Sequence, residues 1–133
     1  MTSGTEPHDS QLRASALERA RAAEAAQART LLTRFIEEAR EAGLTPGPLT
    51  ARGYDGRGTY RTQVEGWYLK RDRSVAVGTD GEFYVMSVQG GVLERLRGTR
   101  VEPSDPPLEL GRGGRDGESI PLDIALDRLL GRE

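Results

Sequence analysis

Residues 66–88 constrain the fold of this 133-residue chain more than any other stretch. Three short apolar runs are separated there by turn-forming residues: Gly66–Lys70, Ser74–Gly78 and Phe83–Val88. Asp80-Gly81, between the last two runs, is typical of a type I′ hairpin turn, which requires positive φ at both central residues. The stretch also contains the only tryptophan, Trp67. We therefore expect neighbouring antiparallel strands that form the centre of a sheet.

Four further segments fit strands by their alternation and flanking turns: Leu49–Tyr54, Gly58–Val64, Val92–Arg97 and Leu108–Leu110. Val92–Arg97 equally fits a single helical turn, and Glu65-Gly66 is expected to form a bulge or bend. Within the run that ends at Val88, Tyr84 and Met86 should point to the face opposite Phe83. Because both faces are apolar, either the sheet curls on itself or a partner covers one face.

A long helix is predicted for Ser10–Gly43, after a tail of residues 1–9 that is expected to be disordered. Asp9 or Ser10 can cap the N-terminus of the helix, and Gly43 suits the left-handed residue that follows a C-terminus. At 1.5 Å per residue this helix would be roughly 51 Å long, which exceeds the width of a small domain.

The two halves of this predicted helix differ in composition. The second half has a wide apolar stripe that should pack on the sheet: Leu31, Leu32, Phe35, Ile36, Ala39 and Ala42. The first half, residues 10–28, is rich in Ala, Arg and Glu and has a narrow stripe: Leu12, Ala16, Ala20 and Ala23. We expect residues 10–28 to be either a solvated extension or a contact arm for another molecule.

A short C-terminal helix is predicted for Ser119–Leu130, with Ser119 as its cap, Pro121 in its first turn and Gly131 at its end. The expected fold class is therefore α+β: a long N-terminal helix, an antiparallel meander sheet of about five to seven strands and a short C-terminal helix. Residues 44–133 should form one domain together with residues 30–43.

Composition argues against several classes of function. The net charge of −2, from 19 basic and 21 acidic residues, is unlike that of a strongly basic nucleic-acid binder. There is no cysteine and a single histidine, His8, so we expect neither a metal site nor a cofactor. No membrane-spanning run or signal peptide is present, which predicts a cytoplasmic protein. The preference for Arg over Lys is typical of GC-rich bacterial genomes.

The Gly- and Arg-rich loop over residues 111–117 is the sharpest candidate ligand site. Its proposed binding residues are Arg112, Gly113, Gly114 and Arg115. Backbone N–H groups, a following helix N-terminus and two guanidiniums would suit a phosphate. The loop departs from the dinucleotide fingerprint because Asp116 occupies the third glycine position. A purely structural turn is the alternative.

A second candidate is a nucleic-acid surface made by aromatic and basic residues near the strands. These residues are Trp67, Tyr68, Arg71 and Arg73. Aromatic side chains on a sheet can stack on single-stranded bases. Acidic residues interleave with the basic ones and weaken their field, and half-buried core aromatics are the alternative interpretation.

No nucleophile, base and orienting residue can be assigned together, so we do not expect an enzyme. We expect a non-enzymatic interaction module that forms a homodimer or binds another protein through the helical arm and an apolar sheet face. The predicted contact residues are Leu12, Ala16, Ala20, Ala23, Tyr84 and Met86. Arg-dependent binding of nucleic acid or a phospholigand, through residues 111–117 and basic strand residues, is the alternative.

Overall fold

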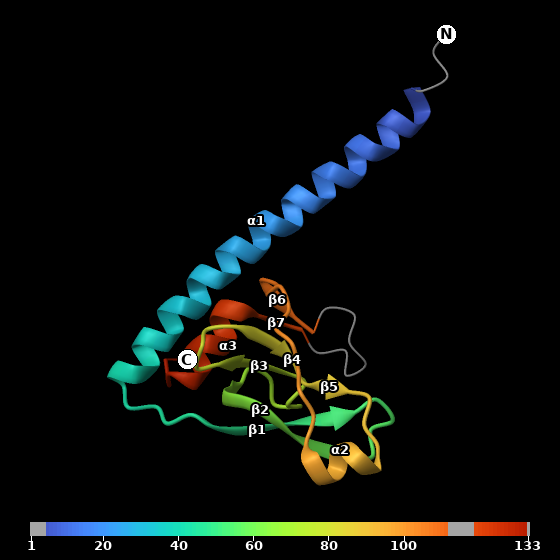
Figure 1. Cartoon of the computed structure of the whole chain (residues 1–133). Coiled ribbons are helices and arrows are strands. Elements are labelled where there is room, and N and C mark those ends of the chain that lie inside the picture. The colour runs from blue at the N-terminus through green and yellow to red at the C-terminus, as the bar shows by residue number, and fades with distance from the viewer. Residues whose placement is uncertain (1–4, 112–118, 133) are drawn as a thin grey trace.

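The computed structural model of the chain describes residues 5–111 and 119–132, with side chains from residue 9 onward. The fold is α+β, as predicted, and a long N-terminal helix projects from a smaller body (Figure 1). The elements follow in the order α1 (Thr5–Glu41), β1 (Gly47–Gly53), β2 (Thr59–Tyr68), β3 (Val75–Gly78), β4 (Phe83–Val85), β5 (Ser87–Val88), α2 (Val92–Arg97), β6 (Glu109–Leu110), β7 (Ile120–Pro121) and α3 (Leu122–Leu129).

α1 begins at Thr5, five residues before the predicted start and within residues 1–9, the tail that was expected to be disordered. Pro7 lies in the first turn, where a helix does not need its N–H. The C-terminus is as expected: Gly43 has φ of 72°, and Leu44 N donates to Ala39 O at 2.9 Å. Together with Gly43 N donating to Arg40 O, this is a Schellman motif, which ends the helix and turns the chain toward β1.

The main sheet has five strands in the order β4-β3-β2-β1-β5. Consecutive strands from β1 to β4 pair antiparallel, but β5 pairs with β1 in parallel, so the sheet is mixed and the prediction of a purely antiparallel meander is wrong. β4 and β5 belong to one interrupted run of chain. β4 lies on one edge of the sheet, and β5 reaches the opposite edge.

Met86 joins the two edges of this sheet. Its N–H donates to Ser74 O beside β3 at 2.9 Å, and its carbonyl accepts from Arg52 N in β1 at 3.0 Å. A sheet whose first and last strands meet at one residue must curl on itself. The sheet therefore forms a small barrel, which was one of the two arrangements that the apolar faces of Phe83–Val88 allowed.

The β3–β4 loop differs from the predicted type I′ turn. Gly81 has φ of 81°, whereas Asp80 is not among the described residues with positive φ. Gly78 N donates to Glu82 O at 3.0 Å, which leaves a three-residue loop closed by a glycine bulge. The Asp80 carboxylate accepts from Glu82 N at 2.9 Å and holds the turn without needing a left-handed aspartate.

β2 is continuous from Thr59 to Tyr68, and the bulge or bend expected at Glu65-Gly66 is not at those two residues. The irregularity lies earlier: Pro48 pairs with Glu65 and Thr50 with Arg61, which places extra β2 residues opposite Leu49. Thr62 Oγ1 donates to Leu49 O at 2.7 Å within this bulge. The bulge increases the local twist and helps the sheet to curl.

Two apolar cores lie on opposite sides of the sheet. The first is formed by α1, α3 and one sheet face, with these buried residues at its centre: Leu32, Phe35, Ala39, Leu69, Val77, Phe83, Leu122 and Leu126. The second fills the barrel: Leu49, Ala51, Tyr60, Val64, Ala76, Tyr84, Met86, Val88 and Val101. Phe83 and Tyr84 therefore point to opposite faces, as their alternation predicted.

The remaining chain closes the body. The 92–97 segment is helical, the second of the two predicted possibilities, and residues 98–104 then pass along the barrel as a strap. α3 begins at Leu122 rather than Ser119, because Ile120 pairs with Leu110 and keeps Pro121 extended. The Ser119 hydroxyl, predicted to cap α3, donates to the Glu109 carboxylate instead.

Candidate functional site

The predicted apolar sheet face is not a surface of the molecule. Tyr84 is 5% exposed and Met86 is fully buried, because both side chains lie inside the barrel. Their assignment as partner-contact residues is therefore wrong for this structure. The sheet covers that face by curling.

From Asp9 to Ala23, α1 faces solvent on every side. Every residue from Asp9 to Ala23 is exposed, including Leu12 at 54% and Leu17 at 52%. Contact with the body begins where Glu24 accepts a hydrogen bond from Leu108 N at 2.9 Å. Ala25 and Ala28 are buried, so the extension predicted for residues 10–28 ends about five residues earlier. We call residues 9–23 the α1 arm.

The stripe on the α1 arm does not continue the face that packs on the body. The buried residues of α1 recur at spacings of three and four: Ala25, Ala28, Leu32, Phe35 and Ala39. At 3.6 residues per turn, Leu12, Ala16, Ala20 and Ala23 are centred roughly 140° away from that face. The arm therefore presents an apolar stripe that no described part of the body covers.

The aromatic residues of the predicted nucleic-acid surface point to opposite faces of β2. Trp67 packs in the first core, edge-on to Phe35, with ring centroids 5.3 Å apart. Tyr68 packs against the second core, and its hydroxyl donates to Thr50 O at 3.0 Å. The Arg73 guanidinium lies 5.7 Å from the centroid of the Tyr68 ring. The four residues do not form one stacking platform.

Basic residues do meet beside the turn between β2 and β3. A cavity of about 410 Å³ between this turn and α3 is lined by Lys70, Arg71 and Arg128. The Lys70 side chain is buried, and its ammonium lies 3.5 Å from the Asp72 carboxylate. Arg73, in the same turn, has φ of 62°, a left-handed conformation that is uncommon for a residue with a side chain.

The other predicted ligand site lies outside the described residues. Arg112, Gly113, Gly114 and Arg115 all fall between residues 111 and 119, where the structure describes nothing. The anion-binding hypothesis for this loop stays a prediction.

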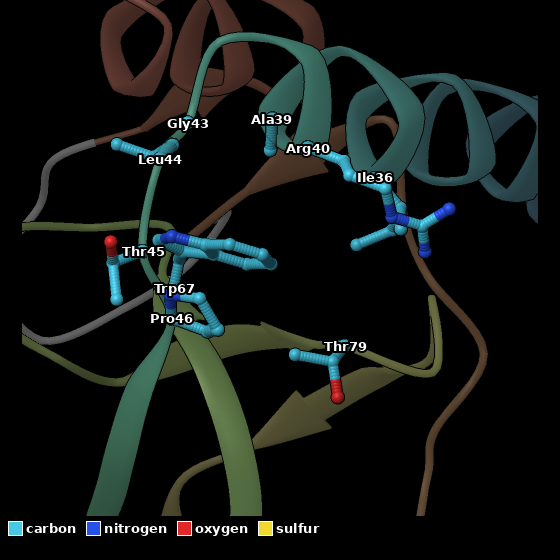
Figure 2. A pocket seen from close by; sticks show the side chains of 9 residues that line it. All are labelled: Ile36, Ala39, Arg40, Gly43, Leu44, Thr45, Pro46, Trp67 and Thr79. Carbon is cyan, nitrogen blue, oxygen red and sulfur yellow. The ribbon is translucent and has the colours of Figure 1, made fainter.

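An apolar cavity of about 300 Å³ separates the end of α1 from β2 (Figure 2). Ile36, Ala39, Leu44 and Pro46 surround the Trp67 ring there, and Arg40 supplies the charged group at the edge. The Trp67 indole nitrogen is buried without a hydrogen-bond partner among the described residues. The lining includes no carboxylate and no histidine, so the cavity itself supplies no acid–base pair.

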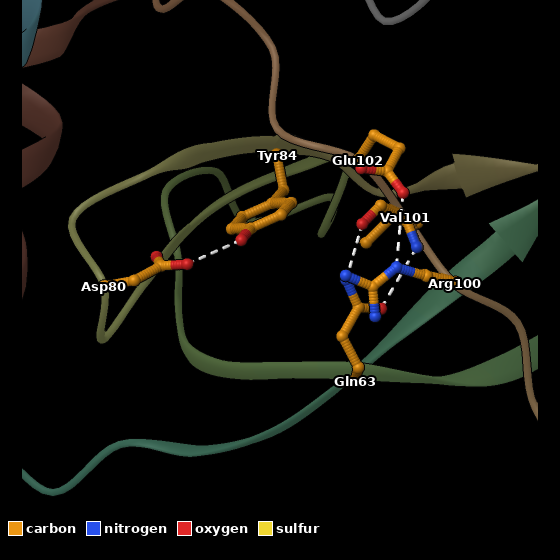
Figure 3. A network of polar contacts seen from close by, with 6 residues as sticks. All are labelled: Gln63, Asp80, Tyr84, Arg100, Val101 and Glu102. Carbon is orange, nitrogen blue, oxygen red and sulfur yellow. Dashed lines mark hydrogen bonds and ion pairs between the residues drawn. The ribbon is translucent and has the colours of Figure 1, made fainter.

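Asp80, which belongs to the β3–β4 turn, also supports the barrel (Figure 3). It accepts a 2.7 Å hydrogen bond from the Tyr84 hydroxyl. Burial, aided by this bond, raises the pKa of Tyr84 to about 12. Among the described residues, no group of three or more acidic or histidine side chains is placed to hold a metal ion.

Two exposed apolar features were not singled out in the sequence. Val92, Leu93 and Leu96 of α2 are all exposed, although their spacing resembles a core-facing helix. Tyr54 and Val85 are 69% and 45% exposed and line one groove with the strap. Residue type alone could not predict that these positions are exposed, because the same apolar residue types fill the core.

No helix in the described part of the chain has a long enough apolar stretch to cross a membrane. Comparisons with family models, curated proteins and solved structures each found no match.

Proposed function

We propose that this chain is a small non-enzymatic interaction module that associates through the α1 arm, most simply with a second copy of itself. The observation that carries the proposal is the exposure of residues 9–23 on every side of a helix that bears its own apolar stripe. Isolated helices of about this length are marginally stable in water. A partner helix on the stripe would supply the tertiary packing that the arm lacks.

The stripe is suited to a neighbouring helix because its side chains are small. Ala16, Ala20 and Ala23 allow two helix axes to approach closely, since interaxial distance depends on the side chains at the contact. Leu12 adds a larger apolar side chain toward the tip of the arm. This contact replaces the sheet face that was predicted to contribute and that lies inside the barrel.

The proposal is tested by placing large charges on the stripe. We expect light scattering after gel filtration to give a mass above the 14.5 kDa monomer for the unmodified chain. Ala16→Arg/Ala20→Arg should restore the monomer mass, because arginines on the stripe prevent close helix approach.

Ala14→Arg/Ala22→Arg is the matched control, because it adds the same charge at exposed positions on other sides of the arm. Its mass should equal that of the unmodified chain. A monomeric unmodified chain would contradict self-association. Equal effects of the two double variants would contradict the role of the stripe.

Binding of a phospholigand or nucleic acid is the second candidate, supported by the cavity that Lys70, Arg71 and Arg128 line. Affinity for a single-stranded oligonucleotide or inorganic phosphate should then fall steeply with salt. Arg71→Ala/Arg128→Ala should abolish that binding. Salt-independent binding, or the same affinity in the double variant, would contradict this candidate.

A further inference from the structure

One edge of β4 points away from its partner β3. Met86 N donates to Ser74 O, and Gly78 N donates to Glu82 O, so these two pairs are hydrogen-bonded. Hydrogen-bonded and non-bonded pairs alternate along an antiparallel ladder, which makes Val75–Val85 a non-bonded pair. The backbone N–H and C=O of Val85 therefore face outward, away from β3.

Ser87 continues the same outward edge. β5 pairs with β1 through its neighbours, because Arg52 N donates to Met86 O and Tyr54 N donates to Val88 O. Successive residues of a strand direct their backbone groups to opposite sides. The Ser87 N–H and C=O thus point away from β1, to the side that Val85 also faces.

The strap, residues 98–104, presents a second edge. Thr99 N donates to Arg61 O, and the Gln63 amide bonds both backbone groups of Val101, so these residues face β2 (Figure 3). Arg100 and Glu102 alternate with them and direct their backbone groups to the opposite side.

The two edges meet at one point and then separate. Ser104 N donates to Phe83 O at 2.8 Å in an isolated antiparallel bridge. Continuing that register would pair Glu102 with Val85 and Arg100 with Ser87. These four residues instead line a groove of about 410 Å³. β1 holds β5 on one side and β2 holds the strap on the other, which keeps the edges apart.

We propose that this groove binds an extended peptide segment of another protein, which adds a strand beside Val85 and Ser87. The outward backbone groups fix the chemistry of the occupant, because rows of strand N–H and C=O groups are complementary to another strand. Exposed Tyr54 and Val85 favour apolar side chains at alternate peptide positions. The site is separate from the α1 arm and does not depend on self-association.

The open edge is tested first by amide hydrogen exchange of the full chain. The Val85 and Ser87 amides should exchange rapidly, whereas the Tyr84 and Met86 amides should be protected by their ladder bonds. Protection of Val85 and Ser87 in the free protein would mean that the strap pairs with β4 and β5, and would overturn the proposal.

Binding is tested with peptides selected from a phage-displayed library of random sequences and then synthesised. A bound peptide should slow exchange of the Val85 and Ser87 amides. Every second N–H group of the bound peptide should face Val85 and Ser87. N-methylation of that set of nitrogens should weaken binding by roughly 3- to 10-fold per lost hydrogen bond. Failure to select any peptide that protects these amides would overturn the proposal, as would equal affinity of both N-methylated sets and the unmodified peptide.

Ser87→Pro removes one outward N–H and should reduce peptide affinity, while Ser87→Ala retains that N–H and should bind as the unmodified chain does. The N-methylated peptides provide the same test without altering the protein, should Ser87→Pro fail to fold. Ala16→Arg/Ala20→Arg should bind the selected peptide normally, which separates this site from the arm. Loss of binding in that arm variant would contradict the groove as the binding site.

Discussion

Gly66 occupies a position where β2 passes very close to the backbone of β3. A Cβ atom at this position would lie 2.0 Å from the Val77 carbonyl oxygen, a contact that no rotamer change relieves because the oxygen is backbone and the backbone alone fixes the Cβ position. Its ladder partner Gly47 has no neighbouring atom within 4 Å of the equivalent position. The two glycines therefore have different roles although they face each other.

Gly66→Ala should lower the free energy of unfolding by about 2–3 kcal/mol, because the methyl group must push β2 and β3 apart. Gly47→Ala should change it by less than about 1 kcal/mol. Urea denaturation of both variants measures the difference. Equal stabilities would show that β2 and β3 do not approach as closely as the structure places them.

Tyr84 should make the protein sensitive to alkali. Its pKa of about 12 in the folded chain exceeds the ordinary value of 10, because the buried phenol resists ionisation. The stabilising effect is fully present below pH 10 and is lost as pH rises from 10 toward 12, where the unfolded chain releases the proton first. The free energy of unfolding should therefore fall less in the Tyr84→Phe variant than in the unmodified chain as the pH rises from 9 to about 11. Thermal unfolding of both proteins across this range measures how steeply stability falls with pH. Equal slopes for the two proteins would contradict the prediction.

α1 combines two segments that experience different surroundings. The C-terminal segment packs on the body through Ala25, Ala28, Leu32, Phe35 and Ala39, whereas the arm has no described contact with it. Secondary structure continues through the boundary because no glycine or proline interrupts the helix between Pro7 and Gly43. Burial rather than helix propensity distinguishes the two segments.

Deleting residues 1–23 should leave the thermal midpoint of the monomeric body almost unchanged, because the described side chains that it removes, from Asp9 to Ala23, are exposed. Deleting residues 1–28 should lower the midpoint by several degrees, since it removes buried Ala25 and Ala28 and the Glu24 bond to Leu108 N. Calorimetry on dilute samples compares the two truncations. Similar midpoints would show that the body does not depend on residues 24–28.

At the scale of the whole molecule, the barrel and the helical layer share the same strands. β3 contributes Val77 to the first core and Ala76 to the second, and β4 divides Phe83 and Tyr84 in the same way. Neither core can lose its packing while the other keeps an intact sheet. We therefore expect the body to unfold as a single cooperative unit in spite of its two cores.

Leu32→Ala in the first core and Met86→Ala in the second should each lower the free energy of unfolding by about 2–5 kcal/mol. Both side chains are fully buried. In each variant, Trp67 fluorescence, which reports on the first core, and far-ultraviolet circular dichroism should give one shared urea midpoint. Separate midpoints would mean that the cores unfold independently.

Local patterns in the sequence determined most of the elements. The glycine that ends α1, the wide stripe from Leu31 to Ala39 and the alternation in Phe83–Val88 all act within a few residues, so they were predictable without a fold. In α3, Leu122, Ala125 and Leu126 recur at helical spacing and are buried, so this face also follows from a local pattern. The turn at Asp80 was located correctly, but its type depended on a side-chain bond to Glu82 N that the dipeptide alone did not reveal.

Only the tertiary structure decided how those elements meet. The parallel β1–β5 pair, the closure at Met86 and the divergence of the strap from Val85 depend on residues far apart in the sequence. The same long-range packing buried Tyr84 and Met86 and left Tyr54 and the α2 leucines exposed, although all are apolar or aromatic. Residue type sets the preference for burial, but tertiary contacts determine which apolar side chains are buried. They therefore also determine which apolar side chains stay exposed for a partner to bind.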